Sequence, residues 1–66
     1  MKVVLNGEER ELPDGLSAGG LLEELGLGRR GVALEINHEL VPRAELDARK
    51  IRDGDRVEIV TLVGGG

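Results

Sequence analysis

The stretch VVLNGEEREL, residues 3–12, decides the fold of this chain. Asn6-Gly7 separates two β-prone segments, and both positions of a tight two-residue turn need the positive φ angles that Asn and Gly tolerate. The stretch therefore predicts a hairpin with strands at residues 3–5 and 8–12. Pro13-Asp14-Gly15 follows and predicts that the second strand ends there.

A short helix is predicted after the hairpin, over residues 18–25. Ser17 precedes it, where a hydroxyl can accept a hydrogen bond from a free N–H of the first turn, and Gly26 predicts a left-handed stop. Gly19 and Gly20 weaken the helix by up to about 1 kcal/mol each relative to alanine, so it depends on tertiary packing. Its apolar face consists of three leucines: Leu21, Leu22 and Leu25.

The remaining segments complete an α+β fold. Residues 32–36 and 39–41 predict two strands around an Asn37-His38 turn, and residues 56–63 predict the longest strand after an Asp53-Gly54-Asp55 turn. One helix on one face of a mixed sheet of four to five strands buries these elements economically. With the first and last strands parallel and adjacent at the centre, the architecture is the β-grasp (ubiquitin-like) fold.

Length and composition limit the chain to one small domain. It has 66 residues, of which 21 are Leu, Val or Ile. We expect a single domain over residues 1–63, with Leu46 and Ile51 as apolar anchors of the polar connection at 43–51, and a flexible glycine tail at 64–66.

Composition also excludes several classes of function. The absence of cysteine excludes disulfides, cysteine-based metal sites and a thiol nucleophile. The formal net charge is −4 and no aromatic side chain is present, so nucleic acid is not an expected partner. No apolar run approaches the ~20 residues of a membrane span, and the N-terminus lacks a signal-peptide core. We expect a cytoplasmic protein that does not associate with membranes.

Two glycine motifs resemble catalytic or cofactor patterns but lie in the wrong context. Residues 15–19 match G-x-S-x-G, yet the nucleophile elbow needs a large sheet with a following acid and histidine, so Ser17 is interpreted as a helix cap. Residues 26–31 match G-x-G-x-x-G, but a helix precedes them and a strand follows, the reverse of a dinucleotide site.

Two further patterns could suggest metal binding. Asp53-Gly54-Asp55 lacks the additional ligands of a calcium loop and is interpreted as a turn. His38 is the single histidine, in a turn beside Glu35 and Glu39, and without a second His or a Cys it predicts no metal site. The residues thus predict no catalytic constellation, no metal and no permanently bound cofactor, which is not the pattern of an enzyme.

The glycine tail, Gly64-Gly65-Gly66, is the remaining feature. Extended, it reaches ~10 Å beyond Val63. Glycine is costly to order and adds no packing, so the tail has no evident role inside the domain. A thin backbone can enter a narrow channel of another protein and present the α-carboxylate of Gly66 there.

The chain resembles the thiamine-biosynthesis branch of the ThiS/MoaD family of ubiquitin-like sulfur carriers. The matching residues cover nearly the whole chain: Asn6-Gly7, residues 31–37, Val41-Pro42-Arg43, residues 53–60 and Gly65-Gly66. It departs from the family at Gly64, where a side chain is expected, at Gly19-Gly20, where better helix formers are usual, and at Leu46, where an aromatic is common.

The resemblance implies a mechanism and partners. An E1-like adenylating enzyme of the ThiF type would consume ATP to adenylate the Gly66 carboxylate. A sulfur donor such as a cysteine desulfurase would then supply the sulfur of a terminal thiocarboxylate, which a ThiG-type thiazole synthase receives. Gly64 and Gly65 would be the tail residues inserted into the partners' active sites.

Other readings remain open at this level. The same design could supply sulfur for molybdopterin, tRNA thiolation or cysteine synthesis, and the thiazole branch is favoured by analogy. Gly66 could instead be joined to lysines of target proteins, as in a ubiquitin-like modifier. The chain could also be an interaction domain with an inert tail.

Strand alternation predicts a partner-binding patch. If Val3, Leu5, Val57 and Ile59 pack under the helix, the neighbouring residues point to the opposite face of the sheet. Grouped exposed apolar residues usually mark a contact site. We therefore expect three aliphatic side chains to emerge together near the tail: Val4, Val60 and Leu62.

Overall fold

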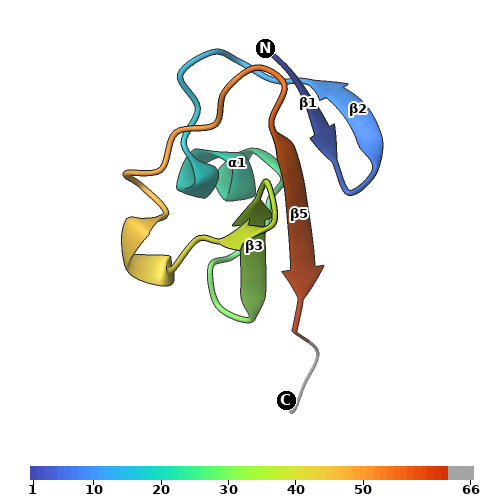
Figure 1. The fold of residues 1–66 in the computed structure, drawn as a ribbon. Helices are drawn as coiled ribbons and strands as arrows, with labels where there is room; N and C mark the ends of the chain where they lie inside the picture. The colour runs from blue at the N-terminus through green and yellow to red at the C-terminus, as the bar shows by residue number, and fades with distance from the viewer. Residues whose placement is uncertain (63–66) are drawn as a thin grey trace.

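The computed structural model describes residues 1–62 (Figure 1). Strands dominate it, with one α-helix and one short 3-10 helix. In chain order the elements are β1 (Lys2–Leu5), β2 (Glu8–Glu11), α1 (Ala18–Glu24), β3 (Val32–Ile36), β4 (Glu39–Leu40), η1 (Arg43–Glu45) and β5 (Arg56–Thr61).

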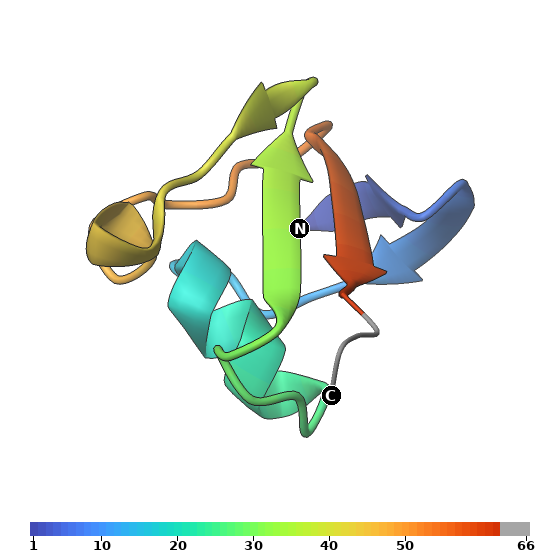
Figure 2. The same ribbon diagram turned by 90° about the horizontal axis from the view of Figure 1, so that it is seen from below.

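The strands form one mixed sheet in the order β2-β1-β5-β3-β4. The central pair, β1 and β5, is parallel, with Val4 beside Arg56, and the other neighbouring pairs are antiparallel. The helix α1 covers one face of this sheet (Figures 1 and 2). This mixed five-stranded sheet with one helix confirms the predicted β-grasp fold.

The predicted turns have the backbone geometry that their residues favour. Asn6 and Gly7 have φ angles of 49° and 83°, and Asn37 and His38 have φ angles of 52° and 69°. All four lie in the left-handed region, which a tight hairpin turn of this kind requires. Both hairpins are therefore encoded locally.

The hydrophobic core lies between α1 and the covered face of the sheet. The predicted anchors Leu46 and Ile51 are both buried there. Ile59 is half-buried and packs against the core, as the alternation along β5 predicts. The largest fully buried side chains are Val3, Leu21, Leu22, Leu34, Ile36 and Val57.

The structure differs from the sequence-based expectation mainly after β3. The strand β4 ends at Leu40; Val41 still donates a backbone hydrogen bond to the carbonyl of its β3 neighbour Leu34, and Pro42 has no N–H with which to continue the pairing. Pro42 precedes η1, a helix of three residues that carries no apolar periodicity and was not predicted. Within residues 1–62, no helix is long and apolar enough to cross a membrane.

Candidate functional site

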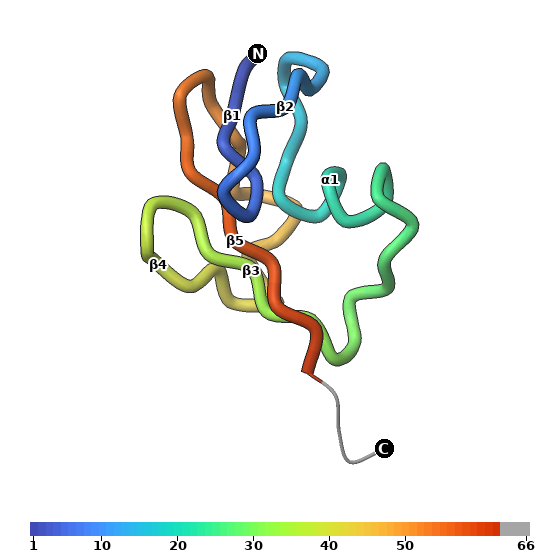
Figure 3. Tube along the Cα trace, turned by 90° about the vertical axis from the view of Figure 1, so that its right-hand side faces the viewer, coloured from blue at the N-terminus to red at the C-terminus, as the bar shows by residue number. Residues whose placement is uncertain are grey.

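The site predicted from the sequence is the end of β5, the open face of the sheet beside it and the glycine tail. Gly64, Gly65 and Gly66 lie outside the described residues. The part of the site that the structure describes is β5 and its surroundings up to Leu62. Figure 3 shows β5 running beside β3.

Backbone and side-chain bonds hold β5 on both edges. Asn6 reaches across from the first turn: its Oδ1 accepts a hydrogen bond from the Ile59 N–H at 2.9 Å, and its Nδ2 donates to the Ile59 carbonyl at 3.3 Å. On the other edge, the Leu62 N–H donates to the Gly31 carbonyl at 2.6 Å. The sequence indicated Asn6 only as a turn residue, and its second role depends on a contact 53 residues away.

Exposed apolar side chains gather on the face of the sheet opposite α1. Val60 follows Ile59, which packs against the core, and Val60 and Leu62 are 55% and 62% exposed. Leu40, which the sequence analysis did not single out, is 61% exposed and lies opposite Glu35, an outward-facing residue of β3. We call Val60 and Leu62 the open-face patch; Leu40 lies outside it, because β3 separates β4 from β5.

Val4 does not join this patch, which corrects the predicted cluster. It points to the same face of the sheet, but it pairs with Arg56, four residues before Val60 along β5. At about 3.3 Å per residue, that separation is about 13 Å. Val4 is half-buried and lines a hollow of about 330 Å³ together with Gly7, His38, Arg56 and Glu58.

The open face also carries a group of titratable side chains. Glu35 of β3 lies directly opposite Glu58 of β5. His38 Nδ1 lies 3.7 Å from Glu58 Oε1, and the ligand atoms of all three residues lie within 4.8 Å of one another. The sequence placed Glu39 beside His38, whereas the structure brings Glu58 there.

The motifs interpreted as structural have structural roles. Ser17 Oγ accepts a hydrogen bond from the Gly20 N–H at 3.0 Å and thus caps α1. Asp53 accepts one from the Lys2 N–H at 2.7 Å, and Asp55 accepts one from the Arg52 N–H at 2.8 Å. Both carboxylates thus accept hydrogen bonds from backbone N–H groups at the turn before β5.

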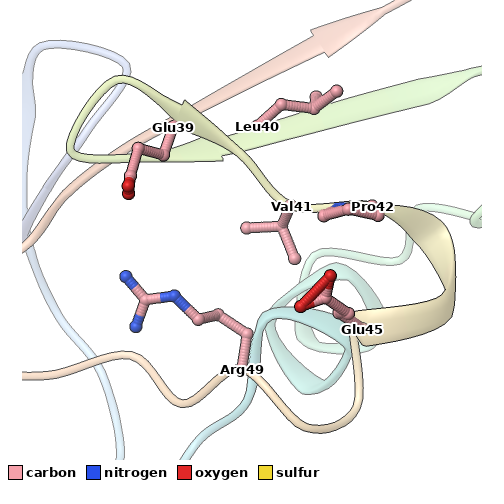
Figure 4. Close-up of a pocket in the computed structure, with 6 residues that line it drawn as sticks. All are labelled: Glu39, Leu40, Val41, Pro42, Glu45 and Arg49. Carbon is pink, nitrogen blue, oxygen red and sulfur yellow. The ribbon is translucent and has the colours of Figure 1, made fainter.

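A second hollow of about 330 Å³ lies between β4 and the connection that follows it (Figure 4). The Glu39 carboxylate and the Arg49 guanidinium point toward one another across it. Its other lining residues are Leu40, Val41, Pro42 and Glu45, so the lining offers no hydroxyl or imidazole nucleophile.

A bidentate ion pair holds the loop that precedes β3. The Arg29 guanidinium donates to both carboxylate oxygens of Asp47, at 2.7 and 3.0 Å. This hydrogen bonding lowers the pKa of Asp47 and raises the pKa of Arg29 from their ordinary values. The pair thereby ties the segment leading to Gly31, the partner of Leu62, to the connection before β5.

Comparison with solved structures supports the fold. The crystal structure of the thiamine biosynthesis protein (ThiS) from Geobacter metallireducens superposes with a TM-score of 0.85 at 32% sequence identity. The match covers 100% of both chains.

Sequence comparisons identify relatives that include sulfur carriers and thiazole synthases. The sulfur carrier protein ThiS of Thermus thermophilus is 45% identical over 64 residues, covering 97% of this chain and 98% of that protein. A thiazole synthase of Paramagnetospirillum magneticum is 46% identical over 66 residues, and there the chain spans only 20% of the relative's length. The ThiS family model matches residues 3–66. The chain belongs to the ThiS family.

Proposed function

We propose that this protein is a sulfur carrier in thiamine biosynthesis, a protein co-substrate of other enzymes and not an enzyme itself. One observation carries the proposal: a protein named as a sulfur carrier aligns with 97% of the chain at 45% identity. The shared β-grasp fold and the family match over residues 3–66 support it.

The functional group in this proposal is the α-carboxylate of Gly66. In the adenylating enzyme the carboxylate oxygen attacks the α-phosphate of ATP and pyrophosphate leaves, which converts a poor leaving oxide into a good one. The persulfide sulfur of a donor then displaces AMP to form an acyl disulfide, and a thiol reductant cleaves its S–S bond, which leaves the terminus as a thiocarboxylate. Gly64 and Gly65 precede Gly66 and provide a backbone without side chains, which is thin enough to enter a narrow channel of the partner.

The proposed acceptor of the sulfur is a thiazole synthase of the ThiG type. Thiazole synthases of Paramagnetospirillum magneticum and Magnetococcus marinus contain a segment that matches the whole of this chain, at 46% and 38% identity. A segment joined to an enzyme in one chain supports a working partnership between the two when they are separate. The adenylating enzyme of the ThiF type and a cysteine desulfurase are proposed from the family's chemistry alone.

The proposed docking surface is the open-face patch. Val60 lies on β5, the last strand before the tail, and Leu62 directly follows that strand, so a partner that packs against them has the tail within reach. The hydrogen bonds of Ile59 and Leu62 fix the direction in which β5 leaves the sheet. Because the end of β5 is held in place, the Gly66 carboxylate can occupy fewer positions relative to the sheet. Positioning of the reacting groups contributes strongly to the rate of a reaction such as adenylation.

The test is reconstitution with ATP, adenylating enzyme and sulfur donor, followed by intact mass. We expect the wild-type chain to exchange one oxygen for sulfur. One added residue after Gly66 should abolish the exchange, because it displaces the reacting carbon from the ATP α-phosphate.

Deletion of Gly66 is the more discriminating change. It leaves Gly64-Gly65 as a di-glycine end with the same chemistry but about 3.5 Å less reach, and we expect strong impairment. Gly65→Val should also fail, since a β-branched side chain restricts the backbone and fills the channel. Normal thiocarboxylate formation on a chain extended past Gly66 would contradict the proposal.

A further inference from the structure

The most unusual feature of the open face is a pair of like charges. Glu35 and Glu58 are direct cross-strand partners in the antiparallel pairing of β3 and β5. Like charges in directly opposite positions destabilise a sheet. We call these two residues the anionic pair.

Within residues 1–62, no lysine or arginine forms an ion pair within 4.0 Å with either member of the anionic pair. The His38 Nδ1 lies 3.7 Å from Glu58, but this imidazole is charged only when protonated. Arg56 precedes Glu58 by two residues on the same face, yet no ion pair within 4.0 Å joins its guanidinium to a carboxylate of the described chain. The two carboxylates are therefore not held in an ion pair by a lysine or arginine of the described chain, although Arg56 lines the same hollow as Glu58.

Exposed apolar side chains flank the anionic pair. Leu40 lies opposite Glu35 on β4, and Val60 follows Glu58 by two residues on β5. Both are more than half exposed. A partner that covers these side chains excludes water from the carboxylates, and exclusion of water strengthens a charge–charge interaction while penalising an unpaired charge.

We propose that the anionic pair receives an arginine side chain of thiazole synthase, which makes it a specificity determinant of the docking surface. The inference rests on the proposed function. A planar guanidinium has five N–H donors and can bond to two carboxylates at once, which the point charge of a lysine does less well. The flanking Leu40 and Val60 can pack against the guanidinium, whereas they offer nothing to a metal ion.

The proposal predicts opposite effects on stability and on binding. Glu58→Gln and Glu35→Gln remove the like-charge repulsion, so each should raise the melting temperature of the isolated chain. Each should also weaken binding to thiazole synthase about tenfold in Kd, because the guanidinium then bonds to a neutral amide oxygen instead of a charged carboxylate. Calorimetric titration of purified thiazole synthase and thermal unfolding of the carrier measure the two effects.

Glu8→Gln is the matched control. Glu8 is exposed and pairs with the core residue Leu5, so it lies on the covered side of the sheet, and its substitution changes the net charge equally. We expect binding to the Glu8 variant to change less than twofold. Equal weakening by all three substitutions would show a general charge effect and overturn the proposal.

Three other outcomes would also overturn it. If the wild-type chain binds thiazole synthase and both anionic-pair variants bind equally well, the pair does not recognise the partner, although the proposed partnership stands. If zinc raises the melting temperature of the wild type but not of Glu58→Gln, the cluster with His38 is a metal site. A wild-type chain that does not bind thiazole synthase removes the partnership and this inference together.

Discussion

At the scale of single residues, Asn6 connects the first turn to the last strand. Its backbone occupies the left-handed region that the turn needs, with φ of 49°. Its side chain bonds both backbone groups of Ile59 and so continues the pairing of β5 after β1 has ended. One residue therefore supports both the hairpin and the strand that leads to the tail.

Asn6→Gly separates these two roles. Glycine keeps the positive φ angle but loses both bonds to Ile59, so we expect the free energy of unfolding to fall by about 1–2 kcal/mol. Urea denaturation measures it. Asn6→Asp is the control: it retains the acceptor for the Ile59 N–H, loses only the donor, and should be intermediate. Wild-type stability in Asn6→Gly would show that the bonds contribute nothing.

The ion pair between Arg29 and Asp47 predicts a pH dependence. Hydrogen bonding to Arg29 lowers the pKa of Asp47 in the folded chain. Its contribution to stability is therefore present above the ordinary aspartate pKa of about 3.9 and is lost as the pH falls through the lowered folded pKa. We expect Asp47→Asn to lose less stability than the wild type as the pH falls below the ordinary aspartate pKa of about 3.9. Parallel acid denaturation curves of the two proteins would refute this.

At the scale of elements, α1 depends on its surroundings. Its seven residues are too few for a stable isolated helix, and it is held by a serine cap and by a buried face that includes Leu21 and Leu22. Gly19 has a further role in this helix. A Cβ there would lie 2.7 Å from Arg29 Nη2 and 2.7 Å from Asp47 Oδ1, so glycine leaves room for the ion pair.

Ser17→Ala tests the start of the helix. We expect a loss of about 1 kcal/mol in the free energy of unfolding, because the Gly20 N–H loses its side-chain acceptor. Ser17→Asp, which supplies another acceptor, should restore most of it. Thiocarboxylate formation at a temperature where both variants are folded should match the wild type, and a specific loss in Ser17→Ala would instead point to a chemical role for the hydroxyl.

At the scale of the whole molecule, one face of the sheet forms the core and the other is exposed. The helix and the connection after β4 cover one face, and the other bears the open-face patch. Because Val60 is 55% exposed, its replacement disturbs the surface more than the core.

We expect Val60→Asp to weaken binding to the adenylating enzyme at least tenfold while leaving the circular dichroism spectrum unchanged, since it places a charge in an apolar contact. Val60→Thr, which keeps the shape of the side chain, should have a milder effect. Unchanged binding by folded Val60→Asp would remove the patch from the docking surface.

The net charge of −4 predicts electrostatic steering toward basic partner surfaces. Association rates with either partner enzyme should fall as ionic strength rises, since the Debye length shortens from about 30 Å at 0.01 M to about 10 Å at 0.1 M. Stopped-flow mixing over a salt series measures this. A rate independent of salt would leave the apolar patch as the main determinant of association.

The sequence by itself determined the elements and their order. Asn6-Gly7 and Asn37-His38 specify turns because their backbones tolerate positive φ, and Ser17 and Gly26 delimit the helix because their preferences act within a few residues. Alternation along β5 also indicated which side chains face the core. These are local properties, so neighbouring residues suffice to predict them.

Only the tertiary structure decided which distant side chains meet. The register of β5 against β1 places Val4 beside Arg56, far from Val60, and its register against β3 places Glu58 opposite Glu35. A shift of a strand changes all such neighbours at once, and the register is set by the joint packing of helix and sheet. The contact of Asn6 with Ile59 and the anionic pair therefore required the assembled sheet.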